Sequence, residues 1–210
     1  MDIIFIILFL LGSYYLLHYR LNLRKAAETS KNALYPITED EFSSILLPNE
    51  YKEMEPLTKG TKSYQYVKWG TWVALFLLVV LLWLVLTTDW FESSAFTVVY
   101  LFIAIITAIR HRGNLFILPK GLILNGKYYS TNQIKYFETE QIIKWHELYG
   151  LHSRINNAYK LSFKVRNNFF QPGFVVIEDK IHLERIATLL KELDIPEKTN
   201  IQKGPDTSLR

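Results

Sequence analysis

The sequence contains no cysteine among its 210 residues. This absence excludes disulfide bonds, thiolate metal sites and a cysteine nucleophile. The 24 lysines and arginines are spaced mostly singly, and no block of them resembles a nucleic-acid-binding arm. A phosphate-binding glycine loop, a paired-histidine metal motif and a nucleophile-elbow serine are also missing. We therefore expect no nucleic-acid partner, no cofactor, no metal and no enzymatic activity.

Charge is missing from three long hydrophobic stretches, residues 3–19, 70–88 and 94–109. A helix rises about 1.5 Å per residue, so each stretch covers most of a hydrocarbon core of about 30 Å. The sequence therefore predicts transmembrane helices at 1–19, 70–88 and 94–109. The first stretch has a signal peptide as its alternative, but its basic residues follow the apolar run rather than precede it. The third has a re-entrant or interfacial segment as its alternative.

Aromatic and basic side chains lie next to the predicted spans. Indole rings prefer the headgroup level of a membrane, and basic residues stay close to its cytoplasmic surface. Five residues are therefore predicted to be membrane-interface anchors: Trp69, Trp72, Trp90, Arg110 and Arg112.

The basic residues also predict an orientation. With three spans, residues 1–2 and 89–93 share one side and contain no lysine or arginine. All 24 basic residues then lie on the opposite side. Because short loops rich in lysine and arginine stay cytoplasmic, we expect a multi-pass protein of the cell membrane with its N-terminus outside. The 20–66 loop and the C-terminal domain are then cytoplasmic.

No ionisable residue lies in the middle of a predicted span, and His18 lies at the end of the first. Transporters and ion channels place such residues at bilayer depth, so the spans are interpreted as anchors. The small or polar residues in the spans are expected to form helix contacts, and they are Gly12, Ser13, Thr97 and Thr107.

The 20–66 loop is expected to begin with a continuation of the first helix from Arg20 to Leu34. Thr38 and Glu41 then have the spacing of a capping box, and Phe42, Ile45 and Leu46 follow at helical spacing as far as Pro48. The adjacent acids at 39–41 have a metal site as their alternative. Acids at a helix start favour capping and the helix dipole instead.

The domain at 113–196 is predicted to contain six or seven antiparallel strands and one closing helix. Asn125–Gly126 is a hairpin dipeptide between two apolar runs, and residues 161–165 alternate apolar with polar. Ile134 and Tyr136 are expected to share a strand face, and further strands are expected at 142–149 and 169–177. The helix is predicted to end at Pro196, with a disordered tail at 197–210. Its expected apolar stripe contains Ile181, Ile186, Leu189, Leu190 and Leu193.

Two runs in this domain carry a resemblance to a known family. LFILPKGLILNGKYYSTNQIKYFE resembles the opening strands of bacterial PH-like domains found beside membrane spans, and VVIEDKIHLERIATLLKEL is similar to their capping helix. The resemblance covers about residues 113–195. It implies an α+β PH-like domain, an antiparallel open barrel with one C-terminal helix.

Three side chains in the predicted 142–149 strand and its surroundings have alternative interpretations. His146 and His152 are six residues apart and are interpreted as unrelated surface residues rather than a metal pair. Trp145 is expected to pack inward, the alternative being an exposed contact with a headgroup or a partner.

The expected function is a non-enzymatic membrane protein whose cytoplasmic PH-like domain binds a protein partner or, as a second choice, lipid headgroups. The alternative is a membrane stress or immunity factor that acts through its transmembrane helices.

Overall fold

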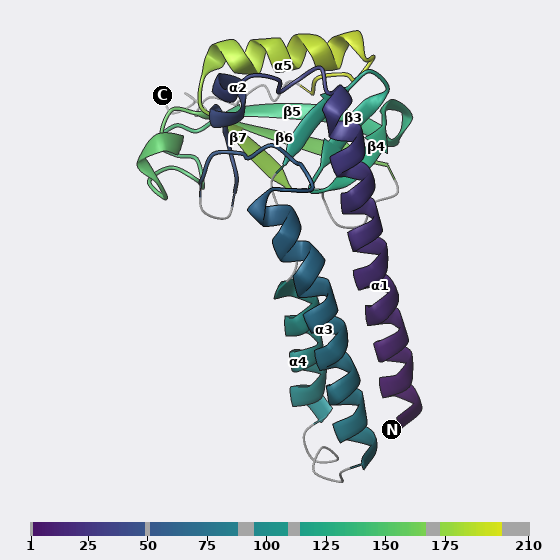
Figure 1. Cartoon of the computed structure of the whole chain (residues 1–210). Coiled ribbons are helices and arrows are strands. Elements are labelled where there is room, and N and C mark those ends of the chain that lie inside the picture. The colour runs from purple at the N-terminus through teal and green to yellow at the C-terminus, as the bar shows by residue number, and fades with distance from the viewer. Residues whose placement is uncertain (1, 49–50, 88–94, 109–113, 167–172, 199–210) are drawn as a thin grey trace. The chain divides into compact units, whose positions relative to one another are not determined.

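The computed structural model describes residues 2–48, 51–87, 95–108, 114–166 and 173–198 (Figure 1). The chain divides into two compact units. The helical unit comprises residues 1–31, 56–111 and 126–128, and the sheet unit comprises residues 32–55, 112–125 and 129–210. The sheet unit is therefore larger than the expected domain, because it includes part of the 20–66 loop.

The helical unit is built from α1 (Asp2–Thr29), α3 (Lys62–Thr87) and α4 (Ala95–Ala108). Residues 5–32 and 62–87 are helices long and apolar enough to cross a membrane. The helix α4 has 14 residues, or about 21 Å, and is shorter than a hydrocarbon core of about 30 Å. Ser94, Ile109 and the 89–93 linker lie outside the described residues.

The helices of this unit pack through small residues and one regular face. The buried residues of α3 are spaced by four, three and four positions, and they are Val67, Thr71, Ala74 and Leu78. A Cβ atom on Gly12 would lie 2.5 Å from Cζ of Phe102, so this glycine lets α1 approach α4. The expectation that Thr97 and Thr107 form helix contacts is wrong, because both are exposed.

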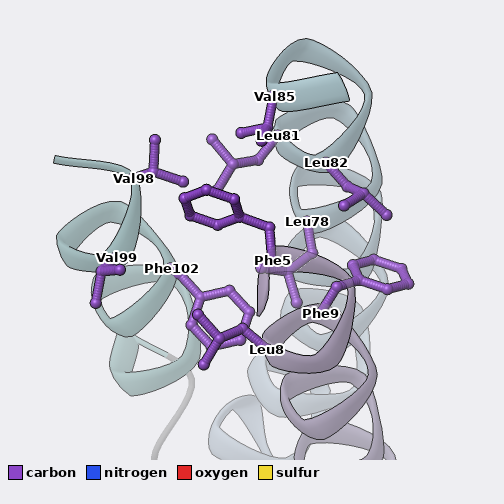
Figure 2. A pocket seen from close by; sticks show the side chains of 10 residues that line it. All are labelled: Phe5, Leu8, Phe9, Leu78, Leu81, Leu82, Val85, Val98, Val99 and Phe102. Carbon is purple, nitrogen blue, oxygen red and sulfur yellow. The ribbon is translucent and has the colours of Figure 1, made fainter. Parts of the chain in front are cut away.

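An apolar crevice lies among the three helices (Figure 2). The crevice is partly open to the surroundings. Ten valine, leucine and phenylalanine side chains line it, including Phe5 of α1, Leu82 of α3 and Phe102 of α4. With no polar group in its lining, the crevice offers nothing that would orient a polar substrate.

The sheet unit contains two antiparallel sheets. The first sheet has the order β2 (Leu115–Leu118), β3 (Gly121–Leu124) and β4 (Lys127–Ser130). The second has the order β1 (Ile45–Leu46), β7 (Phe174–Ile177), β6 (Tyr159–Val165) and β5 (Ile134–Gln141).

The predicted hairpin and the alternating strand are confirmed. Asn125 and Gly126 connect β3 to β4 and have φ values of 52° and 73°, as a type I′ turn requires. Leu161, Phe163 and Val165 are buried in β6, while Ser162 and Lys164 between them are less so. Residues 167–172, which include the start of the strand expected at 169–177, lie outside the described residues.

The segment after Pro36 forms a short helix and then a strand. The helix α2 (Glu39–Ser43) has the predicted capping box of Thr38 and Glu41. The expectation that Ile45 and Leu46 continue this helix is wrong, because they form β1 and pair with Ile177 and Val176 of β7. Both side chains are fully buried, so pairing with a distant strand outweighs the local helical spacing.

In β5, Phe137 rather than Tyr136 is fully buried. The pairing of β5 with β6 shifts register between Ile134 and Tyr136, so the expected alternation is displaced by one residue. Ile134 and Tyr136, which were expected to share a strand face, lie on either side of this shift, and Tyr136 is less buried than Ile134.

The closing helix α5 (Lys180–Glu192) contacts β2 and β7, one strand from each sheet. Its buried residues are Leu183, Ile186 and Leu190. The expectation that Ile181 belongs to this stripe is wrong, because its side chain is 79% exposed. Ile181 is five positions before Ile186, a spacing that places it on another side of the helix.

The chain leaves α5 earlier than expected. Asp194 has a φ of 57°, the left-handed conformation that ends many helices, so Pro196 is not the stop. The amide of Phe137 donates to the carbonyl of Pro196 at 3.0 Å, and the amide of Lys198 donates to the carbonyl of Phe137 at 2.8 Å. Residues 196–198 therefore pair with β5. Residues 199–210 of the expected tail lie outside the described residues.

Candidate interaction site

The chain between β5 and β6, which we call the 142–158 loop, is a series of tight turns. The expectation of a strand at 142–149 is wrong. At the base of the loop the amide of Ile142 donates to the carbonyl of Ala158 at 2.8 Å, and the amide of Asn157 donates to the carbonyl of Ile142 at 2.9 Å. These two bonds close the loop just beyond Gln141 and Tyr159, where the pairing of β5 with β6 ends.

Apolar side chains hold the inner side of the loop. Ile142, Leu148, Ile155 and Ala158 form one buried cluster with Leu46 of β1 and Val176 of β7. Four residues of the loop are thus fixed to the core of the second sheet. The loop has a packed interior of its own, which is typical of compact surface loops with a function.

Polar contacts brace the same loop. His146 accepts the amide proton of Leu148 at Nδ1 over 3.0 Å, so its proton is on Nε2, which lies 3.3 Å from Glu140. Lys160 of β6 contacts the carboxylates of Glu140 at 3.2 Å and Glu147 at 2.9 Å. Burial alone would raise the pKa of Glu140, but hydrogen bonds from His146 and Lys160 outweigh it and lower that pKa. The hydrogen bond from Lys160 also lowers the pKa of Glu147.

The outer side of the loop carries exposed apolar side chains. Trp145 is 89% exposed and Leu151 is 61% exposed, and Tyr149 lies between them in the sequence with its side chain exposed as well. The ammonium of Lys144 lies 6.0 Å from the centre of the Trp145 ring. The expectation that Trp145 packs inward is wrong, because Ile142 and Leu148 take the buried positions. We call Lys144, Trp145, Tyr149 and Leu151 the Trp145 face.

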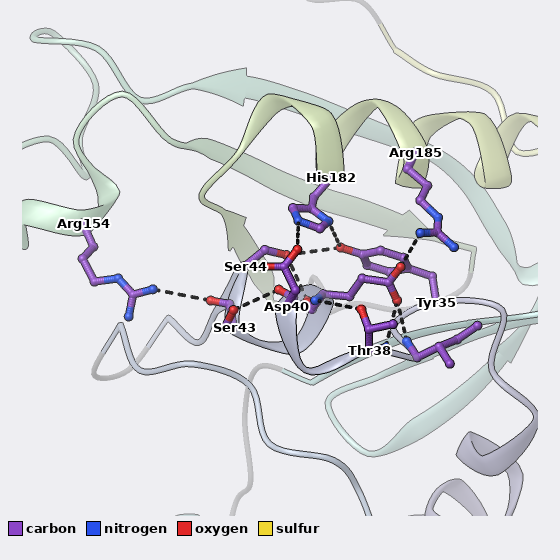
Figure 3. Close-up of polar contacts among 10 residues, drawn as sticks. Tyr35, Thr38, Asp40, Ser43, Ser44, Arg154, His182 and Arg185 are labelled. Atoms are coloured by element: carbon purple, nitrogen blue, oxygen red, sulfur yellow. Dashed lines mark hydrogen bonds and ion pairs between the residues drawn. The ribbon is translucent and has the colours of Figure 1, made fainter.

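A second group of polar residues ties the segment 35–44 to α5, and we call it the buried polar cluster (Figure 3). The Glu41 side chain is 3% exposed; one oxygen is paired with Arg185, and the other accepts the amides of Ile37 at 2.6 Å and Thr38 at 3.3 Å. The Tyr35 hydroxyl lies 3.2 Å from the Ser44 hydroxyl and 3.2 Å from Nδ1 of His182.

The buried polar cluster contains the residue types of a catalytic proton relay, but its hydroxyl groups are not accessible to a substrate. Asp40, His182, Tyr35 and Ser44 form a chain of contacts, since Nε2 of His182 lies 3.2 Å from Asp40. A nucleophile must reach its substrate, but Tyr35 and Ser44 are buried. Burial raises the pKa of Tyr35 to about 12, with the Ser44 hydrogen bond lowering it in part. The cluster therefore holds α2 against α5.

Arg154 forms a third polar group at the edge of the 142–158 loop. Its guanidinium binds both carboxylate oxygens of Glu178, at 3.2 and 2.6 Å, and it also binds Glu53 at 2.8 Å. The hydrogen bond with Glu178 raises the pKa of Arg154 most, followed by the one with Glu53. The bidentate geometry fixes the end of the loop to the end of β7.

No family model, curated protein or solved structure matches this chain.

The predicted anchors lie partly within the described residues. Trp69 and Trp72 are exposed on α3, with Lys68 5.7 Å from the ring centre of Trp69 and Arg20 of α1 5.1 Å from that of Trp72. Trp90, Arg110 and Arg112 lie outside the described residues. Trp83, which is exposed one turn before the end of α3, is not among the predicted anchors, although its position near a span end was a signal for one.

The two histidines near the Trp145 face have separate partners. His146 contacts Glu140, whereas Nδ1 of His152 accepts the amide of Arg154 at 3.2 Å and its ring lies 5.9 Å from that of Tyr51. Among the described residues, no group of three or more His, Asp or Glu side chains is placed to hold a metal ion. The same holds for the acids at 39–41, where Glu41 caps α2.

Proposed function

We propose that this chain is a non-enzymatic, multi-pass membrane protein whose sheet unit is a cytoplasmic interaction domain for a protein partner or lipid headgroups. The observation that carries the proposal is the outward-facing apolar surface of α1 and α3. Only 17% of the most apolar window of each helix is buried, although both are long enough to span a bilayer. A protein that exposed such a surface to water would aggregate, so lipid is its natural surrounding.

Hydroxyl groups on these helices support the same assignment. Thr71 donates to the carbonyl of Val67 at 2.7 Å, Thr87 to that of Trp83 at 2.8 Å, and Thr107 to that of Ile103 at 2.8 Å. Among the described residues the buried Ser13 hydroxyl of α1 has no partner, whereas each of these three hydroxyls on α3 and α4 is satisfied within its own helix. This is the arrangement that a hydrocarbon surrounding requires, because it offers no other hydrogen-bond partner.

The membrane boundary in this proposal lies at the level of Arg20 and Trp72, where the charge-free stretch of α1 ends, that of α3 begins and a cation meets an indole ring. We assign α4 as a third span, completed by residues on either side of 95–108. The basic residues then place the sheet unit in the cytoplasm and the 89–93 linker outside.

For the sheet unit we propose a PH-like fold. Two antiparallel sheets of three and four strands, with one helix that contacts a strand of each, support this assignment. A fold of this kind does not by itself carry an activity, so the function rests on the exposed surfaces. Burial of the hydroxyls in the buried polar cluster supports a binding role rather than catalysis, and the Trp145 face is the surface we assign to binding.

Single-cysteine labelling tests the topology, because the natural chain contains no cysteine. We expect Phe91→Cys to react with a membrane-impermeant maleimide in intact cells. Asp40→Cys and Ser208→Cys should react only after permeabilisation, and the chain should stay in the membrane after alkaline carbonate extraction. Labelling of Asp40→Cys or Ser208→Cys in intact cells, or release by carbonate, would contradict the proposal.

A further inference from the structure

We infer that the Trp145 face inserts into the headgroup region of the phospholipid bilayer that the helices cross. This inference rests on the proposed function and names the ligand of its interaction domain. Trp145 is 89% exposed and Leu151 is 61% exposed, on a loop that buries Ile142, Leu148, Ile155 and Ala158. Such exposure of large apolar side chains on a well-packed loop marks a contact surface.

The side chains of the Trp145 face match the chemistry of a membrane interface. Tryptophan and tyrosine rings have an apolar body and a polar group, and they concentrate at the depth of the lipid headgroups. Lysine extends its alkyl chain along apolar surface while its ammonium reaches phosphate, and Lys144 lies beside the Trp145 ring. Leu151 supplies a fully apolar side chain that can enter the bilayer just below the headgroups.

The formal charges beside the face are balanced, so insertion depends on its aromatic and apolar side chains. The carboxylates of Glu140 and Glu147 are both bound to Lys160, whose single positive charge balances one of their two negative charges. Arg154 is bound to Glu178 and Glu53. The ammonium of Lys144 beside Trp145 supplies the second positive charge and can reach a headgroup phosphate.

The bilayer is also the surface that the sheet unit meets at the highest effective concentration. Residues 109–114 alone connect α4 to β2, and six residues span at most about 20 Å. A tether of this length keeps the membrane within reach at all times. The loop is already ordered by its core and by the contacts of His146, so insertion requires little additional ordering.

The test uses the full chain in nanodiscs of phosphatidylcholine and phosphatidylglycerol, which contain no other membrane protein. An environment-sensitive fluorophore is attached to Leu151→Cys, to Ile181→Cys on the exposed side of α5 or to Phe76→Cys on α3. We expect blue-shifted emission of the Leu151→Cys probe and severalfold stronger quenching by headgroup-level spin-labelled lipids than at Ile181→Cys. Adding Trp145→Ala should abolish most of that quenching, and Lys144→Gln should weaken it in nanodiscs containing phosphatidylglycerol.

The outcomes separate the two proposals. If the Phe76→Cys probe is quenched by deeply spin-labelled lipids while the Leu151→Cys probe stays as water-exposed as that of Ile181→Cys, the inference is wrong and the membrane assignment stands. A water-exposed Phe76→Cys probe would instead overturn the proposed function. If Trp145→Ala leaves the quenching at Leu151→Cys unchanged, Trp145 does not drive insertion and the inference is also wrong.

Discussion

Tyr35 has no exposed surface, and its hydroxyl lies between Ser44 and His182. Burial raises the pKa of this phenol to about 12, and the nearby carboxylate of Glu41 adds to the effect. In the unfolded chain its pKa is about 10. Because the folded state has the higher pKa, the contribution of the neutral Tyr35 phenol to the free energy of unfolding is complete below about pH 10. It is lost as the pH rises towards 12.

We therefore expect Tyr35→Phe to remove the part of the tyrosinate titration that occurs near pH 12. The measurement is the difference in ultraviolet absorbance between wild type and Tyr35→Phe as the pH is raised. In concentrated urea the same difference should move to about pH 10. A difference that is already complete near pH 10 in the folded protein would show that Tyr35 is not buried.

The polar residues also show how far sequence reasoning reaches at this scale. Thr38 and Glu41 could be predicted as a capping box because both partners lie within four positions. The ion pair of Glu41 with Arg185 could not, because 144 positions separate the two residues. The exposure of Trp145 was also missed, since it depends on the turns that replace the expected strand.

At the scale of helices and strands, the sequence pattern predicts the features that depend only on neighbouring residues. The Asn125–Gly126 turn and the alternation of β6 could be predicted for this reason. The strand β1 could not, because its backbone partners are in β7, and the register shift in β5 moved the buried position to Phe137. Ile181 is the corresponding error for a helix. An apolar residue belongs to the buried stripe only if its position around the helix axis places it on the buried side.

The contact between α1 and α4 gives a prediction for Gly12→Val. A side chain at this position meets the ring of Phe102 and the end of Ile106, so overpacking should destabilise the helical unit by about 1–3 kcal/mol. Helix propensity alone predicts the opposite sign, because glycine is the poorer helix former. The measurement is unfolding of the purified chain in sodium dodecyl sulfate, followed by the circular dichroism of its helices.

Leu11→Val is the matched control, since it introduces the same side chain at a neighbouring, exposed position of α1. It should change stability by less than Gly12→Val. Equal stabilities of the two variants would show that Gly12 does not lie against α4.

At the scale of the whole molecule, the proposed topology gives the two units different surroundings. The sheet unit has a water-excluded core that includes residues of the segment 32–55, among them Tyr35, Ile45 and Leu46. The proposed spans instead keep their backbone hydrogen bonds within each helix, which lipid enforces. Urea acts on surfaces that unfolding exposes to water, so it should unfold the sheet unit first.

Glu41→Ala tests this separation. The change removes the ion pair with Arg185 and leaves the amides of Ile37 and Thr38 without the carboxylate, so the sheet unit should lose about 2 kcal/mol. In nanodiscs, pulse proteolysis in urea should show its unfolding midpoint lowered by about 1 M. Gly12→Val should leave that midpoint unchanged, while protease-resistant helical fragments persist in both variants. A lowered midpoint in Gly12→Val would mean that the two units unfold together.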